Sequence, residues 1–107
     1  MNVYSNPENY GLTIIGDIEF SNNNYQFDTR VFFKDSDGNI FTASDAGCSC
    51  PEPFEEYTSI EDLGSVSYDN IQQFYDEVNR SINVWSVTNL VEALETLQNI
   101  KRMLKEN

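Results

Sequence analysis

The sequence predicts an α+β domain in which a three-stranded antiparallel meander packs against two C-terminal α-helices. Polar and apolar residues alternate through residues 12–44, turn signals separate these runs, and the apolar spacing becomes helical after Ser67. Strands followed by helices are typical of this class. At 107 residues we expect a single domain. It would comprise an irregular segment (1–10), the meander (11–44), a rigid loop with a short helical turn (45–66) and two helices (67–105).

The two longer strands are expected to be buried on one face only. Residues 12–20 and 25–34 alternate with a period of two, and a turn at 21–24 joins them. A second turn around Gly38 leads to a short third strand at 40–44. The residues expected to face the core are Leu12, Ile14, Ile18 and Phe20, then Tyr25, Phe27, Thr29, Val31 and Phe33. Those expected to face outward include Gln26, Asp28, Arg30 and Lys34.

The second half of the chain carries helix signals. Thr58 to Glu61 fits a capping box for a short turn that Gly64 stops. From Ser67 a helical stripe is expected, and a break at 81–85 separates it from a last helix that starts at Ser86 or Thr88. The stripe of the first helix is Ile71, Phe74, Tyr75, Val78 and Ile82. That of the last is Val87, Leu90, Val91, Leu94, Leu97, Ile100 and Leu104.

The charge is strongly acidic and unevenly distributed. The net charge is −12, and no Lys or Arg occurs between Asp35 and Asn79, where eleven Asp and Glu residues lie. Such a field repels phosphate backbones, so direct nucleic-acid binding is not expected. It attracts basic protein surfaces, although an acidic surface can also serve solubility alone. No apolar run approaches the roughly 20 residues of a membrane helix, and no secretory signal is evident, so we expect a cytoplasmic protein without membrane contact.

Both cysteines lie in an unusual segment, Gly47 to Tyr57, which reads GCSCPEPFEEY. Cys48 and Cys50 are the candidates for a metal site, but structural zinc takes four ligands and the chain has no His. A disulfide between them would close a small, strained ring. We therefore expect reduced, packed thiols, no metal and no cofactor. Without His, a phosphate loop or a nucleophile motif, we expect no enzymatic activity.

The same segment provides the candidate partner-binding residues. Two prolines at alternate positions favour an extended chain, which would hold Phe54 and Tyr57 three residues apart. These rings either fill the core between sheet and helices or act as anchors inside an acidic rim. The candidate contact residues are Glu52, Phe54, Glu55, Glu56, Tyr57, Glu61 and Asp62.

The stretch Ser44 to Leu63, SDAGCSCPEPFEEYTSIEDL, resembles a family of small uncharacterised proteins encoded by tailed phages. These proteins share a Gly-Cys-Ser-Cys-Pro centre followed by a proline, an aromatic residue, an acid and a turn that ends in leucine. The resemblance covers about Val31 to Leu63 and implies a phage origin, with no assigned activity and no site residues.

Together these observations predict a binding protein that acts in an infected bacterial cell. It would inhibit a host nucleic-acid-processing or defence factor, in the manner of an anti-CRISPR protein or a DNA mimic, by occupying a basic protein surface. The alternatives are a small-ligand binder, in which Arg30, Lys34 and Arg80 meet a signalling nucleotide or the cysteine loop holds a metal, and a structural or virion-assembly accessory. A homodimer is left open.

Overall fold

The computed structural model describes residues 2–21, 26–48, 53–81 and 87–106. It confirms an α+β fold with an antiparallel sheet and two C-terminal helices. The strands are β1 (Leu12–Glu19), β2 (Gln26–Asp35), β3 (Ile40–Cys48) and β4 (Gly64–Val66), and they lie in the order β1-β2-β3-β4. The helices are α1 (Gln72–Arg80) and α2 (Val87–Glu106), and two short 3-10 turns are η1 (Pro7–Tyr10) and η2 (Ile60–Asp62).

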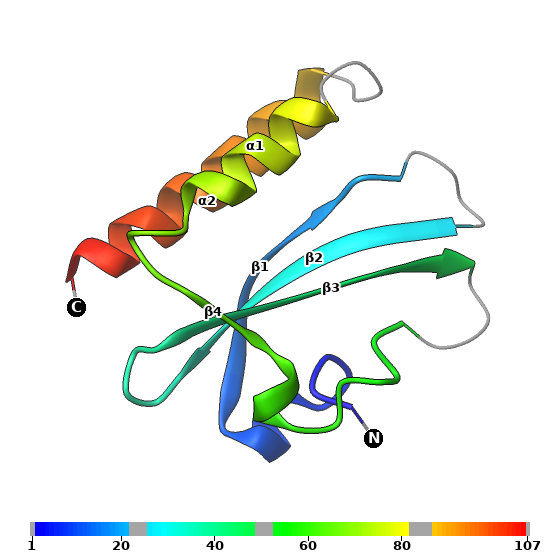
Figure 1. Cartoon of the computed structure of the whole chain (residues 1–107), viewed down its shortest axis with the longest axis vertical. Helices are drawn as coiled ribbons and strands as arrows, with labels where there is room; N and C mark the ends of the chain where they lie inside the picture. The colour runs from blue at the N-terminus through cyan, green and yellow to red at the C-terminus, as the bar shows by residue number, and fades with distance from the viewer. Residues whose placement is uncertain (1, 22–25, 49–52, 82–86, 107) are drawn as a thin grey trace.

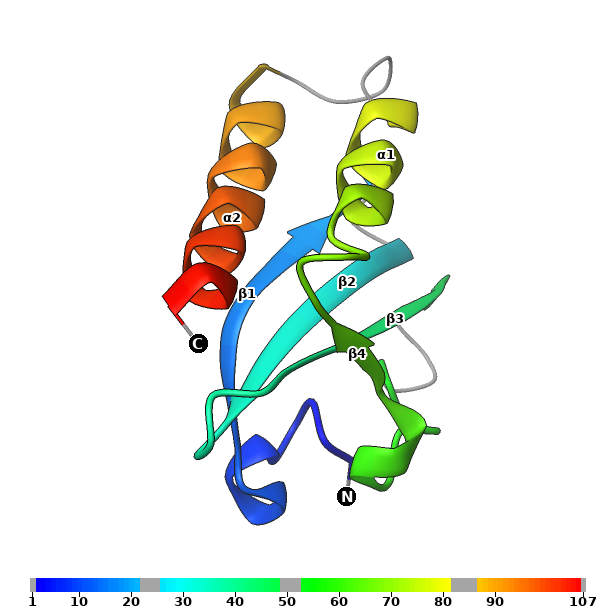
Figure 2. The same ribbon diagram turned by 60° about the vertical axis from the view of Figure 1, so that its left-hand side comes forward.

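The molecule has three layers (Figure 1). α1 and α2 lie side by side on one face of the sheet, as both ribbon views show (Figure 2). We call them the helix layer. Residues 2–11 and 53–63 lie on the opposite face, and we call them the loop layer. The sheet is therefore covered on both faces.

The prediction of three strands was wrong, because the sheet has four. Leu63 leaves η2 in an extended conformation, with φ −90° and ψ 152°, and β4 then pairs antiparallel with Ile40 to Thr42 of β3. A strand of three residues is too short to show an alternating pattern in the sequence. The capping box that precedes β4 is also shifted by one residue along the chain. It joins Ser59 to Asp62, and the Asp62 carboxylate accepts hydrogen bonds from the backbone N–H groups of Thr58 and Ser59.

The expected inward face of β2 does not meet the helices. Val31 and Phe33 are buried against the loop layer, whereas Phe32 is buried against the helix layer. Arg30, expected to face outward, points to the helix layer and bonds to Glu77 of α1. A strand with two buried faces loses the simple alternation from which one face was inferred.

β1 also changes face along its length. The β1–β2 register shifts between Ile14 and Gly16, as at a β-bulge. Leu12, before the shift, packs in the loop-layer cluster, and Ile18, after it, packs in the helix-layer cluster. The single inward face predicted for this strand was therefore wrong, and Ile14 is 36% exposed.

The helix layer agrees better with the sequence. Phe74 and Val78 of α1 and Leu97 and Ile100 of α2 are buried in one cluster with sheet residues. Ile82 and the expected break between the helices fall mostly outside the described residues. The apolar stripe predicted for α2 included too many residues. Val91 and Leu94 are exposed, whereas Ala93, which the prediction omitted, is buried.

Candidate functional site

The loop layer is organised around Phe54, whose side chain is completely buried. Its ring stacks on Tyr4 with centroids 4.6 Å apart and lies 5.7 Å from the ring of Tyr57. The backbone at Phe54 has φ +63°, a conformation that non-glycine residues rarely adopt. The Asp45 carboxylate accepts the N–H of Phe54 at 2.8 Å and so holds this turn against β3. The side chain is therefore a core residue, but it lies in the loop-layer cluster and not between the sheet and the helices as expected.

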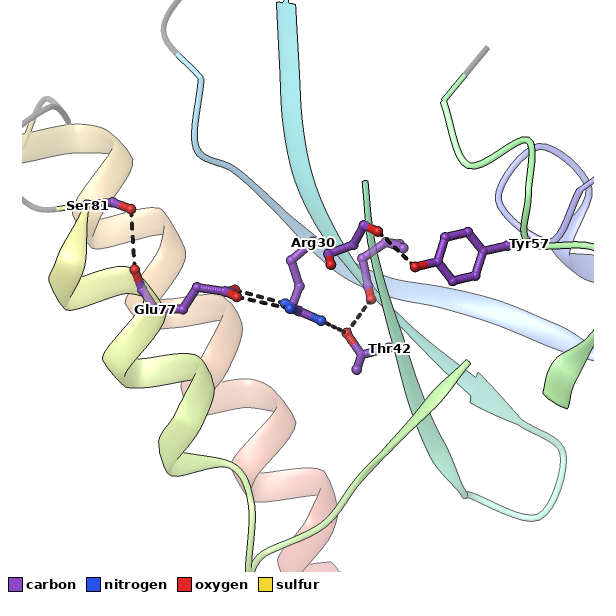
Figure 3. A network of polar contacts seen from close by, with 7 residues as sticks. Arg30, Thr42, Tyr57, Glu77 and Ser81 are labelled. Carbon is purple, nitrogen blue, oxygen red and sulfur yellow. Dashed lines mark hydrogen bonds and ion pairs between the residues drawn. The ribbon is translucent and has the colours of Figure 1, made fainter. Parts of the chain in front are cut away.

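Tyr57 ties the same segment to two other parts of the molecule. Its hydroxyl donates to the backbone carbonyl of Ser44 at 2.9 Å (Figure 3). Its own carbonyl accepts the N–H of Val3 at 2.9 Å. Tyr57 is half-buried, so it both supports the corner and presents part of its ring.

The candidate carboxylates separate into three groups. Glu55, Glu56 and Glu61 are exposed, and no hydrogen bond of their side chains is recorded among the described residues. Asp62 is exposed but caps η2. Glu52 and Cys50 lie outside the described residues, as does the side chain of Cys48. The expectation of packed thiols is therefore left untested.

An exposed apolar residue that sequence reasoning missed lies among these acids. Ile60, at the start of η2, is 38% exposed and is followed directly by Glu61. It was overlooked because it stood inside the expected capping box. Phe54 is buried, whereas Ile60 is an exposed apolar side chain of the described loop layer.

Charge is segregated between the two faces of the sheet. The loop layer carries five carboxylates and no Lys or Arg; its acids are Glu8, Glu55, Glu56, Glu61 and Asp62. All six basic side chains of the chain lie on the helix side. Four belong to α1 and α2, and Arg30 bonds to α1. Lys34 is the cross-strand partner of Ile40, which packs against the helices, and paired residues share a face.

β1 adds two further acids beside the loop layer. Asp17 and Glu19 pair with Val31 and Thr29 of β2, and Glu19 accepts a hydrogen bond from the Thr29 hydroxyl. Burial raises the pKa of the Tyr4 phenol, and the carboxylates of Asp17 and Glu19 raise it further. The carboxylates of β1 therefore act electrostatically on Tyr4 of the loop layer.

On the helix side, Arg30 and Glu77 neutralise each other's charge in an ion pair (Figure 3). Arg30 Nε and Nη2 donate to the two carboxylate oxygens of Glu77 at 2.8 and 2.9 Å. Its Nη1 donates to the Thr42 hydroxyl at 3.1 Å, and Thr42 donates to the Val31 carbonyl. The guanidinium also lies 5.0 Å from the centroid of the Phe74 ring. All three guanidinium nitrogens are engaged, which fits a structural role.

The structure does not assemble the three cations of the nucleotide alternative at one site. A pocket of about 180 Å³ lies beside the end of α1, and its charged lining residues are Asp28, Glu77 and Arg80. Arg30 is held by Glu77, and Lys34 does not line this pocket. Two carboxylates around a single available cation disfavour an anionic ligand.

Within the described ranges no group of three or more Asp, Glu, Cys or His side chains could hold a metal ion. The turn at residues 35–39 is closed by hydrogen bonds between its own residues. The Asn39 side-chain amide donates to the Asp35 carboxylate and lowers the pKa of that carboxyl, and the backbone N–H groups of Asn39 and Asp37 lower it further. The hairpin-turn interpretation of this segment therefore agrees with its hydrogen bonds.

The model of one protein family, described as Domain of unknown function (DUF7574), matches residues 1–106. The chain belongs to this family. No curated protein and no solved structure matches it significantly. This match fits the expectation of an uncharacterised family, and it does not test the phage origin. Among the described residues no helix is long and apolar enough to cross a membrane.

Proposed function

We propose that this protein binds a basic surface of another protein through its loop layer and so inhibits a host nucleic-acid-processing or defence factor. The observation that carries the proposal is the segregation of charge. One face of the sheet presents carboxylates without any Lys or Arg, while every basic side chain lies on the other side. A net charge of −12 spread evenly would serve solubility equally well, whereas a one-signed face orients a partner.

The shape of the loop layer supports recognition by a fixed surface. Phe54 is buried, its N–H is held by Asp45, and the Tyr57 hydroxyl is held by Ser44. Glu55 and Glu56 lie between these two attachment points, so little conformational freedom is lost when a partner binds. Ile60 adds an exposed apolar contact beside the acids.

The choice of target class rests on charge and on the resemblance over Val31 to Leu63. If the protein comes from a phage, the proteins that it meets are those of the infected host. Among these, enzymes that bind nucleic acids carry basic grooves. An acidic face that occupies such a groove competes with the nucleic acid itself. The partner is thus a protein with a basic surface, bound in the bacterial cytoplasm.

The test is an affinity capture from bacterial lysate with immobilised protein, repeated with two charge-reversed variants. Glu55→Lys/Glu56→Lys reverses two charges on the loop layer, and Glu92→Lys/Glu95→Lys makes the same change in exposed positions of α2. We expect the first variant alone to lose the captured protein, and duplex DNA to displace it from the unmodified protein. If every captured protein is insensitive to the Glu55/Glu56 reversal, the proposal fails.

A further inference from the structure

The outer side of α2 carries a stripe of exposed residues that the proposed function does not use. Figure 2 shows α2 at the margin of the helix layer, with α1 along one of its sides. The members of the stripe follow one another at three or four residues and therefore share one face of the helix. Val91 and Leu94, which are 47% and 36% exposed, begin it. Gln98, Arg102 and Lys105 continue it and are exposed as well, and we call these five residues the outer stripe.

The charge of α2 changes sign along its length. Residues 87–96 hold two acids and no Lys or Arg, whereas residues 97–105 hold three cations and no acid. Glu95 lies at the edge of the outer stripe, seven residues before Arg102. That separation is about 10 Å along the helix, which is out of reach of an ion pair within one copy. Within the described residues no hydrogen bond or ion pair of the Glu95 side chain is recorded, and the Arg102 guanidinium donates to Asn99 alone.

The helix dipole explains only part of this pattern. It favours acids in the first turn of a helix and cations in the last turn. Glu95 is the ninth residue of α2 and Arg102 lies before its last turn, so the dipole does not select either position. The dipole also gives no reason for the exposure of Val91 and Leu94. A second helix packed on the outer stripe accounts for both the charges and the exposed apolar residues.

A helix whose acids precede its cations is complementary to its own copy in the antiparallel direction. We propose that the outer stripe of α2 binds a second copy of this chain as an antiparallel helix pair. A twofold axis near Gln98 places Glu95 of each copy opposite Arg102 of the other, because Glu95 lies three residues before the axis and Arg102 four residues after it. Both copies use the same surface, so the contact closes into a dimer and the Glu95–Arg102 contact is made twice.

The apolar residues of the outer stripe meet matching groups in the same arrangement. Val91 lies seven residues before Gln98 and Lys105 seven residues after it, so each Val91 faces the methylene stem of Lys105 in the other copy. Leu94 faces the stem of Arg102 in the same way. Long cationic side chains cover apolar surface with their stems while the charged ends stay in water. The pairing therefore covers the exposed apolar residues of both stripes without burying a charge.

The net charge of −12 limits the strength of this dimer. A single pair of helices about 30 Å long also buries less area than a standard interface, so we expect weak and reversible association. At an ionic strength of 0.15 M, charges more than about 8 Å apart are largely screened. The acidic loop layer lies on the opposite face of the sheet (Figure 1), whereas the charges of the outer stripe meet at close range. The dimer leaves the loop layer accessible, so its test does not depend on the proposed function.

The experiment is sedimentation equilibrium of the full chain from about 10 μM to about 1 mM, at an ionic strength of about 0.15 M. A reductant is present, so that disulfides between copies cannot imitate the dimer. We expect a reversible equilibrium between monomer and dimer with a dissociation constant of about 1 mM or less. A chain that stays monomeric throughout this range would leave the outer stripe to a different partner and so overturn the proposal.

Two single variants make the same charge change on α2. Glu95→Lys should weaken dimerisation about tenfold, because two attractive contacts in each dimer become repulsive. Glu92→Lys is the control and should change it less than about threefold, since Glu92 lines a pocket with Asp17 of β1, away from the outer stripe. Both variants make the net charge less negative, so repulsion between whole molecules alone would let both dimerise more strongly.

A double variant exchanges the two charges that the proposal brings together. Glu95→Lys with Arg102→Glu should restore dimerisation to within about threefold of the unmodified chain, because each contact again joins opposite charges. Glu95→Gln gives a milder check if the reversal disturbs folding, which circular dichroism shows. Equal effects of Glu95→Lys and Glu92→Lys, or no recovery in the double variant, would place the dimer contact elsewhere and contradict the proposal.

Discussion

The helix layer and the loop layer cover the two faces of one sheet in different ways. On the helix side, apolar residues at helical spacing pack on Phe32 and Ile18. On the loop side there is no repeated pattern, and the cover depends on Phe54, on its contact with Tyr4 and on hydrogen bonds between side chains and backbone. The shape of the loop layer is thus fixed by individual residues, whereas that of the helix layer follows from a repeated pattern.

The two layers also differ in charge. The helix layer mixes acids with cations and contains the Arg30–Glu77 pair. The loop layer presents carboxylates alone. A face built for stability can neutralise its own charges, whereas a face that attracts a basic partner keeps them unpaired.

The largest effect is expected where the loop layer depends on one residue. Phe54→Ala should lower the free energy of unfolding by about 3–5 kcal/mol, because it leaves a cavity beneath Tyr4. Urea denaturation measures this loss. Tyr57→Phe, which removes only the hydroxyl bond to Ser44, should cost about 1 kcal/mol or less. A cost below about 1 kcal/mol for Phe54→Ala would show that the ring does not organise this layer.

The next effect tests how closely the helix layer approaches the sheet. A Cβ at position 16 would lie 2.8 Å from Thr96 Cγ2 on α2. Gly16→Ala should therefore cost about 1–3 kcal/mol in thermal or urea unfolding. Thr96→Ser removes that methyl group and should recover most of the loss in the double variant. Purely additive costs would argue against direct contact between these positions.

A smaller effect is expected from the ion pair on the helix side. Arg30 and Glu77 side chains are 15% and 27% exposed, so part of the interaction is shielded from water. Glu77→Gln should lower stability by about 1–2 kcal/mol, because it leaves the Arg30 charge without a counter-ion and offers it one acceptor oxygen in place of two. Asp76→Asn, on the neighbouring exposed position, is the control and should change stability by less than about 0.5 kcal/mol. Similar losses of stability in both variants would show that the Arg30–Glu77 ion pair contributes no more to stability than an exposed carboxylate does.

The smallest effect concerns Asp28. Burial raises the pKa of its carboxyl above the ordinary 3.8, and the carboxylates of Glu19 and Glu77 add to the rise, while Arg30 opposes it. A raised pKa means that the folded state binds this proton more tightly, so ionised Asp28 disfavours folding at neutral pH. Asp28→Asn should raise the melting temperature slightly at pH 7, and the gain should disappear as the pH falls through the raised pKa. A gain that is independent of pH would contradict this cause.

The sequence predicted the parts of the fold that repeat. The helical stripe of α1 around Phe74 and Val78 and the hairpin turn at Gly38 follow from spacing and turn chemistry. The covering of both sheet faces was missed, because Phe32 stood beside Phe33 in a run without clean alternation. β4 was missed because three residues carry no period.

The partner-binding site stays a prediction, and the arrangement of its residues could not be predicted from the sequence. Glu55, Glu56 and Glu61 are exposed as an acidic rim requires. The burial of Phe54 depends on a left-handed backbone and on Asp45, nine residues earlier in the chain, and neither is visible in local sequence. Arg30 looked like an outward residue because its partner Glu77 lies on a helix that the strand pattern cannot place.

The most direct test of the central claim is amide hydrogen exchange of this protein, alone and in complex with the protein captured from lysate. If the loop layer is the recognition face, binding slows exchange at residues 55–62 and leaves the exposed side of α2 unchanged. Slowed exchange confined to α1 and α2, with residues 55–62 unaffected, would contradict the account.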